Sequence, residues 1–113
     1  MEKKILSAAS FYKKSYYFNF DDFADLPYAV QKELQKIITS AAEHTRGEIL
    51  MGIYSDGQVF LESRGADDDY DYDEIGAKYY VNKTAKDEEE FFESIQIWYM
   101  VTRLGGDISA ISN

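Results

Sequence analysis

The segment that most constrains how this chain can fold is residues 48–64, EILMGIYSDGQVFLESR. Two runs rich in β-branched and aromatic residues flank Asp56-Gly57, a dipeptide typical of the tight turn in a two-residue β-hairpin. The sequence therefore predicts a hairpin whose loop consists of Asp56 and Gly57. With this loop the predicted cross-strand pairs are Tyr54 with Val59, Ile53 with Phe60, Gly52 with Leu61, and Met51 with Glu62.

Both faces of this hairpin carry apolar side chains. A strand with one face in water alternates apolar and polar residues, and residues 49–53 do not alternate. A sheet that is apolar on both sides needs two covers, which are either helices on each face or a partner protein on one face. The hairpin therefore favours either a fold that covers both faces or a function in protein interaction.

A third strand is predicted over Ile75–Val81, because IGAKYYV has the tyrosine and valine content typical of strands. Alternate residues from Ala77 to Val81 would share one face. The same segment could instead be part of a helix, so its register stays open. Together with the hairpin it would complete a small three-stranded antiparallel sheet.

Helical spacing of apolar residues predicts two helices before the hairpin. Residues 2–17 form the first, ending near Tyr16, although its far end could instead be extended. The second begins after Asp25-Leu26-Pro27 and ends at Gly47, since proline favours the first turn and glycine the end of a helix. The apolar residues of the second helix are Val30, Leu34, Ile37, Ile38 and Ala41.

A last helix is predicted to begin at Thr84, which would form a capping box with Asp87. Three glutamates in its first turn would interact favourably with the helix dipole. Gly105-Gly106 would end it, and residues 105–113 are expected to fray. Its apolar residues are Phe91 or Phe92, Ile95, Trp98, Val101 and Leu104.

These elements predict a single α+β domain over residues 1–113, with the small antiparallel sheet packed against helices in the order ααβββα. The chain has the length of one domain and one proline, which leaves no room for a flexible linker.

The net charge of −9 is distributed unevenly along the chain. Residues 1–55 have seven acidic and seven basic side chains, for a balance of zero, whereas residues 56–113 have fourteen acidic and five basic ones, for −9. Such a surface repels nucleic acids and anionic membranes and favours a basic protein partner. Solubility is the alternative role of this charge.

The chain is expected to be a soluble cytoplasmic protein. It has no cysteine, which suits a reducing compartment. The basic start at Lys3-Lys4 resembles a signal peptide, but Ser7 and Ser10 interrupt its apolar stretch. No segment has the roughly 18 apolar residues that a membrane span needs.

The segment GADDDYDYDE, residues 65–74, has the densest charge in the chain. If residues 67–73 are extended, four aspartates lie along one side. A solvated loop, with its tyrosines over the sheet edge, is one interpretation, and weak binding of divalent cations is another. The known calcium-loop pattern does not fit, because its glycine position falls on Tyr72 or Glu74.

A third interpretation makes this segment part of a nucleic-acid mimic, continued by the acids of residues 87–93. The candidate partner-binding residues are the acidic Asp67, Asp68, Asp69, Asp71, Asp73, Glu74, Glu88 and Glu89 and the aromatic Tyr70 and Tyr72.

The sequence contains no catalytic signature. His44, the only histidine, is predicted near the end of the second helix, where an imidazolium can interact with the terminal carbonyls. Neither of the glycine-rich phosphate-binding motifs is present. We therefore expect a protein that is not an enzyme and has no catalytic residue, no cofactor and no metal site.

Several short motifs resemble a known family. They are YYFN at residues 16–19, LP at 26–27, KEL at 32–34, the DG of the hairpin, and DYDEIGA at 71–77. The chain resembles, over nearly its whole length, a family of small uncharacterised single-domain proteins from Gram-positive anaerobic bacteria. The resemblance implies a cytoplasmic location and one α+β domain. It implies no functional residue, because the family has no assigned activity.

The function expected from these observations is a non-enzymatic acidic protein-interaction module. It would use an exposed apolar or aromatic face and an acidic rim to bind a protein partner. This partner could be a basic protein or a second copy of the chain. One alternative is a nucleic-acid-mimicking inhibitor of a basic nuclease or toxin, of the anti-CRISPR or anti-restriction type. Another is a weak divalent-cation binder through residues 67–74.

Overall fold

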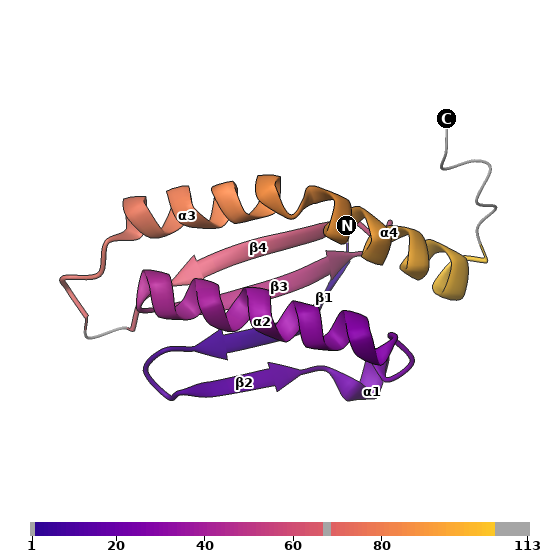
Figure 1. Ribbon diagram of the computed structural model, residues 1–113, viewed down its shortest axis with the longest axis horizontal. Helices are drawn as coiled ribbons and strands as arrows, with labels where there is room; N and C mark the ends of the chain where they lie inside the picture. Colours follow the sequence, from indigo (N-terminus) through magenta and orange to yellow (C-terminus); the bar gives the residue numbers. More distant parts are fainter. Residues whose placement is uncertain (1, 67–68, 106–113) are drawn as a thin grey trace.

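The computed structural model describes residues 2–66 and 69–105, in which four strands form one antiparallel sheet in the order β2-β1-β3-β4 (Figure 1). The α+β class is confirmed, whereas the predicted three strands and the order ααβββα are wrong, because the observed order is ββααββαα. The strands are β1 (Lys3–Ser10), β2 (Ser15–Phe18), β3 (Glu48–Tyr54) and β4 (Val59–Arg64). The helices are α1 (Phe20–Phe23), α2 (Tyr28–Thr45), α3 (Glu74–Asp87) and α4 (Glu89–Arg103).

The predicted first helix is wrong, since its residues form the β1–β2 hairpin. The residues at helical spacing do not share a face: Ile5 is 46% exposed, whereas Ala9 is buried beside Ile49 of β3. A turn at residues 11–14, with Lys14 at a φ of 48°, reverses the chain. Pairing with β3, whose residues lie 38 to 51 positions away in sequence, stabilises β1 as the second strand of the sheet.

The predicted second helix is confirmed as α2. It begins directly after Pro27, and its apolar stripe from Leu34 to Ala42 is buried against β1 and β3. In Figure 1, α2 crosses in front of these two strands. The last residue of the helix is Thr45, and Arg46 caps it in the left-handed conformation with a φ of 56°, one residue before the glycine expected to end the helix.

The β3–β4 hairpin is confirmed, but its register differs by one residue from the prediction. The amide of Tyr54 donates to the carbonyl of Gln58 at 2.9 Å, so the loop has the three residues Ser55, Asp56 and Gly57. Gly57 has a φ of 88°, which a three-residue hairpin loop commonly requires of its last position. The observed pairs are Ile53 with Val59, Gly52 with Phe60, Met51 with Leu61, and Leu50 with Glu62.

This register keeps a charge out of the core. The predicted register pairs Glu62 with Met51, whose side chain is fully buried. The observed register instead pairs Met51 with Leu61 and leaves Glu62 exposed. A slip of one residue exchanges the two faces of a strand, so burial of the apolar face selects the observed pairing.

The predicted third strand over residues 75–81 is wrong, because the segment forms the first half of α3. Asp73 caps this helix by accepting a hydrogen bond from the amide of Gly76 at 2.9 Å. Ala77 and Val81, which are one helical turn apart, are its buried residues. α3 runs beside β4 and contacts it, as Figure 1 shows.

The last predicted helix begins later than expected. Thr84 lies inside α3, and the chain bends at Glu88, whose amide donates to the carbonyl of Thr84. α4 follows, with Phe92 and Ile95 buried as predicted, but Val101 and Leu104 are 40% and 50% exposed. The fraying expected for residues 105–113 falls, apart from Gly105, on residues that lie outside the described ones. None of the helices described is long and apolar enough to cross a membrane.

Candidate functional site: the open face of the sheet

Within residues 2–66 and 69–105, helices cover one face of the sheet and no helix or strand covers the other. Ile49, Met51 and Ile53 of β3 are fully buried in a core that also contains the buried residues of α2, α3 and α4. The alternate residues of β3 point to the other side of the sheet. We name that side the open face and define it by the apolar and aromatic residues Ile5, Ala8, Tyr17, Leu50, Tyr54 and Phe60, which cross-strand pairing places together.

The open face does not belong to the hydrophobic core. Its six residues are all outside the core cluster and the partly buried residues packed against that cluster. Tyr17 is 51% exposed and Ile5 46%, while Leu50, Tyr54 and Phe60 are partly covered. Large contiguous apolar patches are uncommon on the surfaces of monomeric proteins, so the open face is a candidate contact site.

Two aromatic rings stand at one end of the open face. The ring of Phe60 lies over Gly52, where a Cβ atom would be 2.1 Å from the Phe60 Cζ. The rings of Tyr54 and Phe60 pack together with centroids 4.6 Å apart. Gly52 therefore allows the Phe60 ring to lie flat on the sheet, which a larger residue would prevent.

A shallow hollow lies at the other end of the open face, with a volume of about 210 Å³. Its apolar lining includes Ala8, Tyr17 and Leu50. Charged side chains surround this lining, and they are Lys13, Glu48, Glu62 and Arg64.

The charges on and around the open face nearly cancel. Lys3 lies over the Phe60 ring, with its Nζ 5.3 Å from the centroid, and forms an ion pair with Glu62 at 3.7 Å. With Lys13, Arg64 and Glu48 the balance is three positive against two negative charges, or +1. The net charge of the whole chain is −9, so its acidic excess lies on other surfaces.

The described part of the acidic segment is a turn and not the extended strand considered above. The Oδ1 of Asp69 accepts from the amide of Asp71 at 3.2 Å, and its Oδ2 accepts from the hydroxyl of Tyr12 at 3.1 Å. Partial desolvation raises the pKa of Tyr12, and the neighbouring Asp69 carboxylate adds to this effect. Asp69 thus stabilises the loop, Asp73 caps α3, and the predicted site residues Asp67 and Asp68 lie outside the described residues.

The two tyrosines of the acidic segment have different environments. Tyr70 is 95% exposed. Tyr72 packs into a space left by two glycines, since a Cβ on Gly47 or on Gly65 would lie within 2.6 Å of its ring. Tyr72 therefore ties the loop to the ends of α2 and β4.

The acidic site residues form two groups and not one row. Asp69, Asp71, Asp73 and Glu74 are at the start of α3, whereas Glu88 and Glu89 are at its other end (Figure 1). A helix of 14 residues separates them by about 21 Å. Among the described residues, no three side chains of the kinds that bind metals are placed to hold an ion.

His44 lies in the last turn of α2, as predicted. Its ring stacks on that of Tyr80 of α3, with centroids 3.9 Å apart and planes at 12°. The histidine therefore contributes to the packing between α2 and α3. Its side chain is otherwise exposed to solvent.

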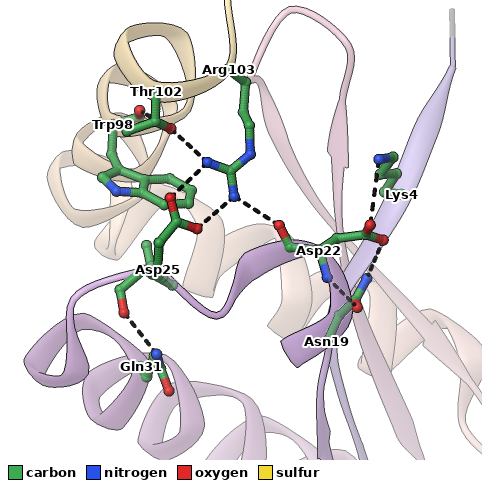
Figure 2. Close-up of polar contacts among 9 residues, drawn as sticks. Lys4, Asn19, Asp22, Asp25, Gln31, Trp98, Thr102 and Arg103 are labelled. Atoms are coloured by element: carbon green, nitrogen blue, oxygen red, sulfur yellow. Dashed lines mark hydrogen bonds and ion pairs between the residues drawn. The ribbon is translucent and has the colours of Figure 1, made fainter.

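A polar cluster fastens α4 to the rest of the protein (Figure 2). Nothing in the sequence predicted this cluster. The guanidinium of Arg103 donates two hydrogen bonds to the carboxylate of Asp25, at 2.6 and 2.8 Å, and one to the carbonyl of Asp22 at 2.7 Å. It also lies 4.8 Å from the centroid of the Trp98 ring. Because 78 residues separate the ion pair in sequence, no local pattern could have identified it.

Comparison with known proteins adds the family. No curated protein and no solved structure matches the chain. The sequence motifs led us to expect a family without assigned activity, and membership of such a family is confirmed. The sequence profile of the family of unknown function DUF6145 matches residues 3–107, and the chain therefore belongs to this family.

Proposed function

We propose that this chain is a non-enzymatic protein-interaction module whose open face binds another protein. One observation carries the proposal: the helices cover one side of the sheet, while Ile5, Tyr17 and Leu50 form an apolar surface on the other. Burying such a surface against a partner removes apolar area from water, at about 25 cal/mol per Å².

The proposal agrees with the chemical composition of the open face. Fully buried centres of interfaces are depleted in charge and enriched in aromatic residues, and the open face has Tyr17, Tyr54 and Phe60 with a charged rim. The acidic surfaces elsewhere would form an outer rim that keeps the protein soluble. We place the module in the cytoplasm of a Gram-positive anaerobic bacterium, as the resemblance in the sequence implies.

The test compares two matched substitutions in a tagged protein. Ile5→Arg adds a charge to the open face, whereas Ile75→Arg makes the same change on α3, where Ile75 is 85% exposed. We expect a partner captured by the wild type and by Ile75→Arg to be lost with Ile5→Arg. Calorimetry with the purified partner should then show at least about tenfold weaker binding for Ile5→Arg alone.

Equal binding of the partner to all three proteins would refute the proposal. Unchanged thermal unfolding of Ile5→Arg is the control for folding, and exposed positions on a strand usually tolerate such a change. Capture alone is not sufficient, because only the difference between the two arginine variants locates the contact on the open face.

The nucleic-acid mimic has less support from the geometry. Its two acidic groups are separated by α3, which carries Lys78, Lys83 and Lys86 between them. A mimic would bind a basic enzyme with an affinity that falls steeply as salt rises. It would also lose binding when Asp67, Asp69, Asp71 and Asp73 become Asn, whereas an apolar contact at the open face would persist under both treatments.

Binding of divalent cations at residues 67–74 also has little geometric support. Asp69 and Asp73 already accept hydrogen bonds within the loop and at the helix cap. A cation at this place would have to compete with these contacts.

A further inference from the structure

We infer that the partner of the open face is a second copy of this chain, so that two sheets pack face to face in a symmetric dimer. This inference rests on the proposed function, because it names the occupant of the same surface. Three observations support it, namely the charge of the open face, its shape and its size.

The charge of the open face suits a second copy. Two molecules with a charge of −9 repel each other wherever their acidic surfaces meet. The open face, with a balance of +1 over Lys3, Lys13, Arg64, Glu48 and Glu62, avoids this repulsion. A strongly basic partner would instead be attracted to the acidic surfaces and would find no opposite charge on the open face.

The open face has a different shape at its two ends. The ring pair of Tyr54 and Phe60, which packs against the sheet over Gly52, lies at the end of the sheet where β1 begins, and the hollow lies toward the end where β3 begins. A two-fold axis that runs across the strands, in the plane between two sheets, exchanges these ends. The ring pair of each copy then lies over the hollow of the other.

The same axis brings opposite charges together. Lys3 is at the ring-pair end, whereas Glu48 is at the hollow end. In the dimer, each Lys3 approaches the Glu48 of the second copy. The two sheets, about 10 Å apart, would form an eight-stranded sandwich with the helices on its outer sides.

The size of the open face predicts the strength of the dimer. Four strands about 4.8 Å apart, of eight, four, seven and six residues, present a surface of roughly 20 Å by 20 Å. Interfaces of this size are at the lower end of specific protein contacts, so we expect a Kd in the micromolar range.

Sedimentation equilibrium from about 5 to about 500 µM, a range chosen around this expected Kd, tests the inference. The wild type should change from the monomer mass of 13.0 kDa to twice that mass. Ile5→Arg and Tyr17→Arg should weaken the dimer at least about tenfold. The control variants Ile75→Arg and Tyr79→Arg, at positions 85% and 72% exposed on α3, should dimerise as the wild type does.

A second measurement does not depend on a disruptive substitution. Because the chain has no cysteine, Tyr17→Cys and Tyr79→Cys each provide one site for a nitroxide spin label. In the proposed dimer, the two labels at position 17 lie in or beside the interface, whereas labels at position 79 lie on the outer sides. The label separation should therefore be markedly shorter for Tyr17→Cys.

The outcomes distinguish this inference from the proposed function. A wild type that stays monomeric over the whole range overturns the dimer, but the proposed function still stands if the capture experiment shows a partner lost with Ile5→Arg. A dimer that is weakened by Ile75→Arg and not by Ile5→Arg also overturns the inference, because the contact then lies on α3. The proposed function is overturned only by the capture experiment, when the partner binds equally to the wild type, Ile5→Arg and Ile75→Arg.

Discussion

At the scale of single residues, close packing explains the glycine at position 47. The end of α2 was predicted from Gly47, yet Arg46 is the residue in the left-handed conformation. Gly47 is buried, and a Cβ there would be 2.6 Å from the Tyr72 ring and 2.7 Å from the carbonyl oxygen of Arg64. The glycine therefore provides space for Tyr72, which anchors the acidic loop.

Gly47→Ala should lower the free energy of unfolding by about 1 to 3 kcal/mol, because the new methyl group must displace a ring and a backbone carbonyl. Urea denaturation followed by circular dichroism measures the change. The neighbouring Arg46→Gly is the control and should raise stability by up to about 1 kcal/mol, since glycine adopts a positive φ without strain. A Gly47→Ala protein as stable as the wild type would contradict this role of the glycine.

At the scale of secondary-structure elements, amphipathic periodicity predicted α2 and the apolar centre of α4 but failed elsewhere. Residues 2–17 and 75–81 have patterns compatible with both strand and helix, and the prediction for each segment was wrong. Long-range contacts decide these segments, because β1 is stabilised by pairing with β3 and α3 by packing on β4. The Arg103 cluster is likewise a contact between distant elements (Figure 2).

The ion pair that fastens α4 should make stability depend on pH. The hydrogen bonds from Arg103 lower the pKa of Asp25 below its usual value of 3.8. As the pH falls, the carboxyl group of Asp25 therefore takes up a proton at a higher pH in the unfolded chain than in the folded one. The contribution of the ion pair to the free energy of unfolding is present above about pH 4 and is lost at lower pH.

Asp25→Asn should accordingly be less stable than the wild type at pH 7, and the two should converge at acidic pH. Thermal unfolding from about pH 7 to about pH 2.5, a range that covers the titration of carboxyl groups, measures this difference. Asp21→Asn is the matched control, because Asp21 forms no ion pair with the described residues. A difference that stays constant over the whole range would show that the ionisation of Asp25 has no part in holding α4.

At the scale of the whole molecule, the protein has an acidic surface and a nearly neutral open face. The sequence showed the unequal charge of its two halves. It could not show that the open face and the acidic excess lie apart, because Ile5, Ala8 and Tyr17 join the hairpin only through strand pairing. The candidate site therefore moves from the acidic residues predicted for it to the open face.

The dimer should become stronger as salt concentration rises. Two copies that meet through neutral apolar surfaces still repel each other over longer distances, and salt screens this repulsion. Raising sodium chloride from about 0.05 M to about 0.5 M shortens the screening length from about 14 Å to about 4 Å, so the Kd should fall several-fold. Sedimentation at both concentrations measures it, with Ile5→Arg as the monomeric control. A Kd that rises with salt would instead show that the contacts of Lys3 with Glu48 outweigh the repulsion between the acidic surfaces, and would contradict this prediction.

The sequence by itself determined the features that depend on neighbouring residues. These are the helix α2, the presence of a hairpin at Asp56-Gly57, the α+β class and the apolar character of both hairpin faces. Only the tertiary structure decided the register of that hairpin, the two strands at the N-terminus and the side of the sheet left uncovered. The physical reason is that burial of Met51 and Ile53, and pairing of β1 with β3, depend on contacts between residues far apart in the chain.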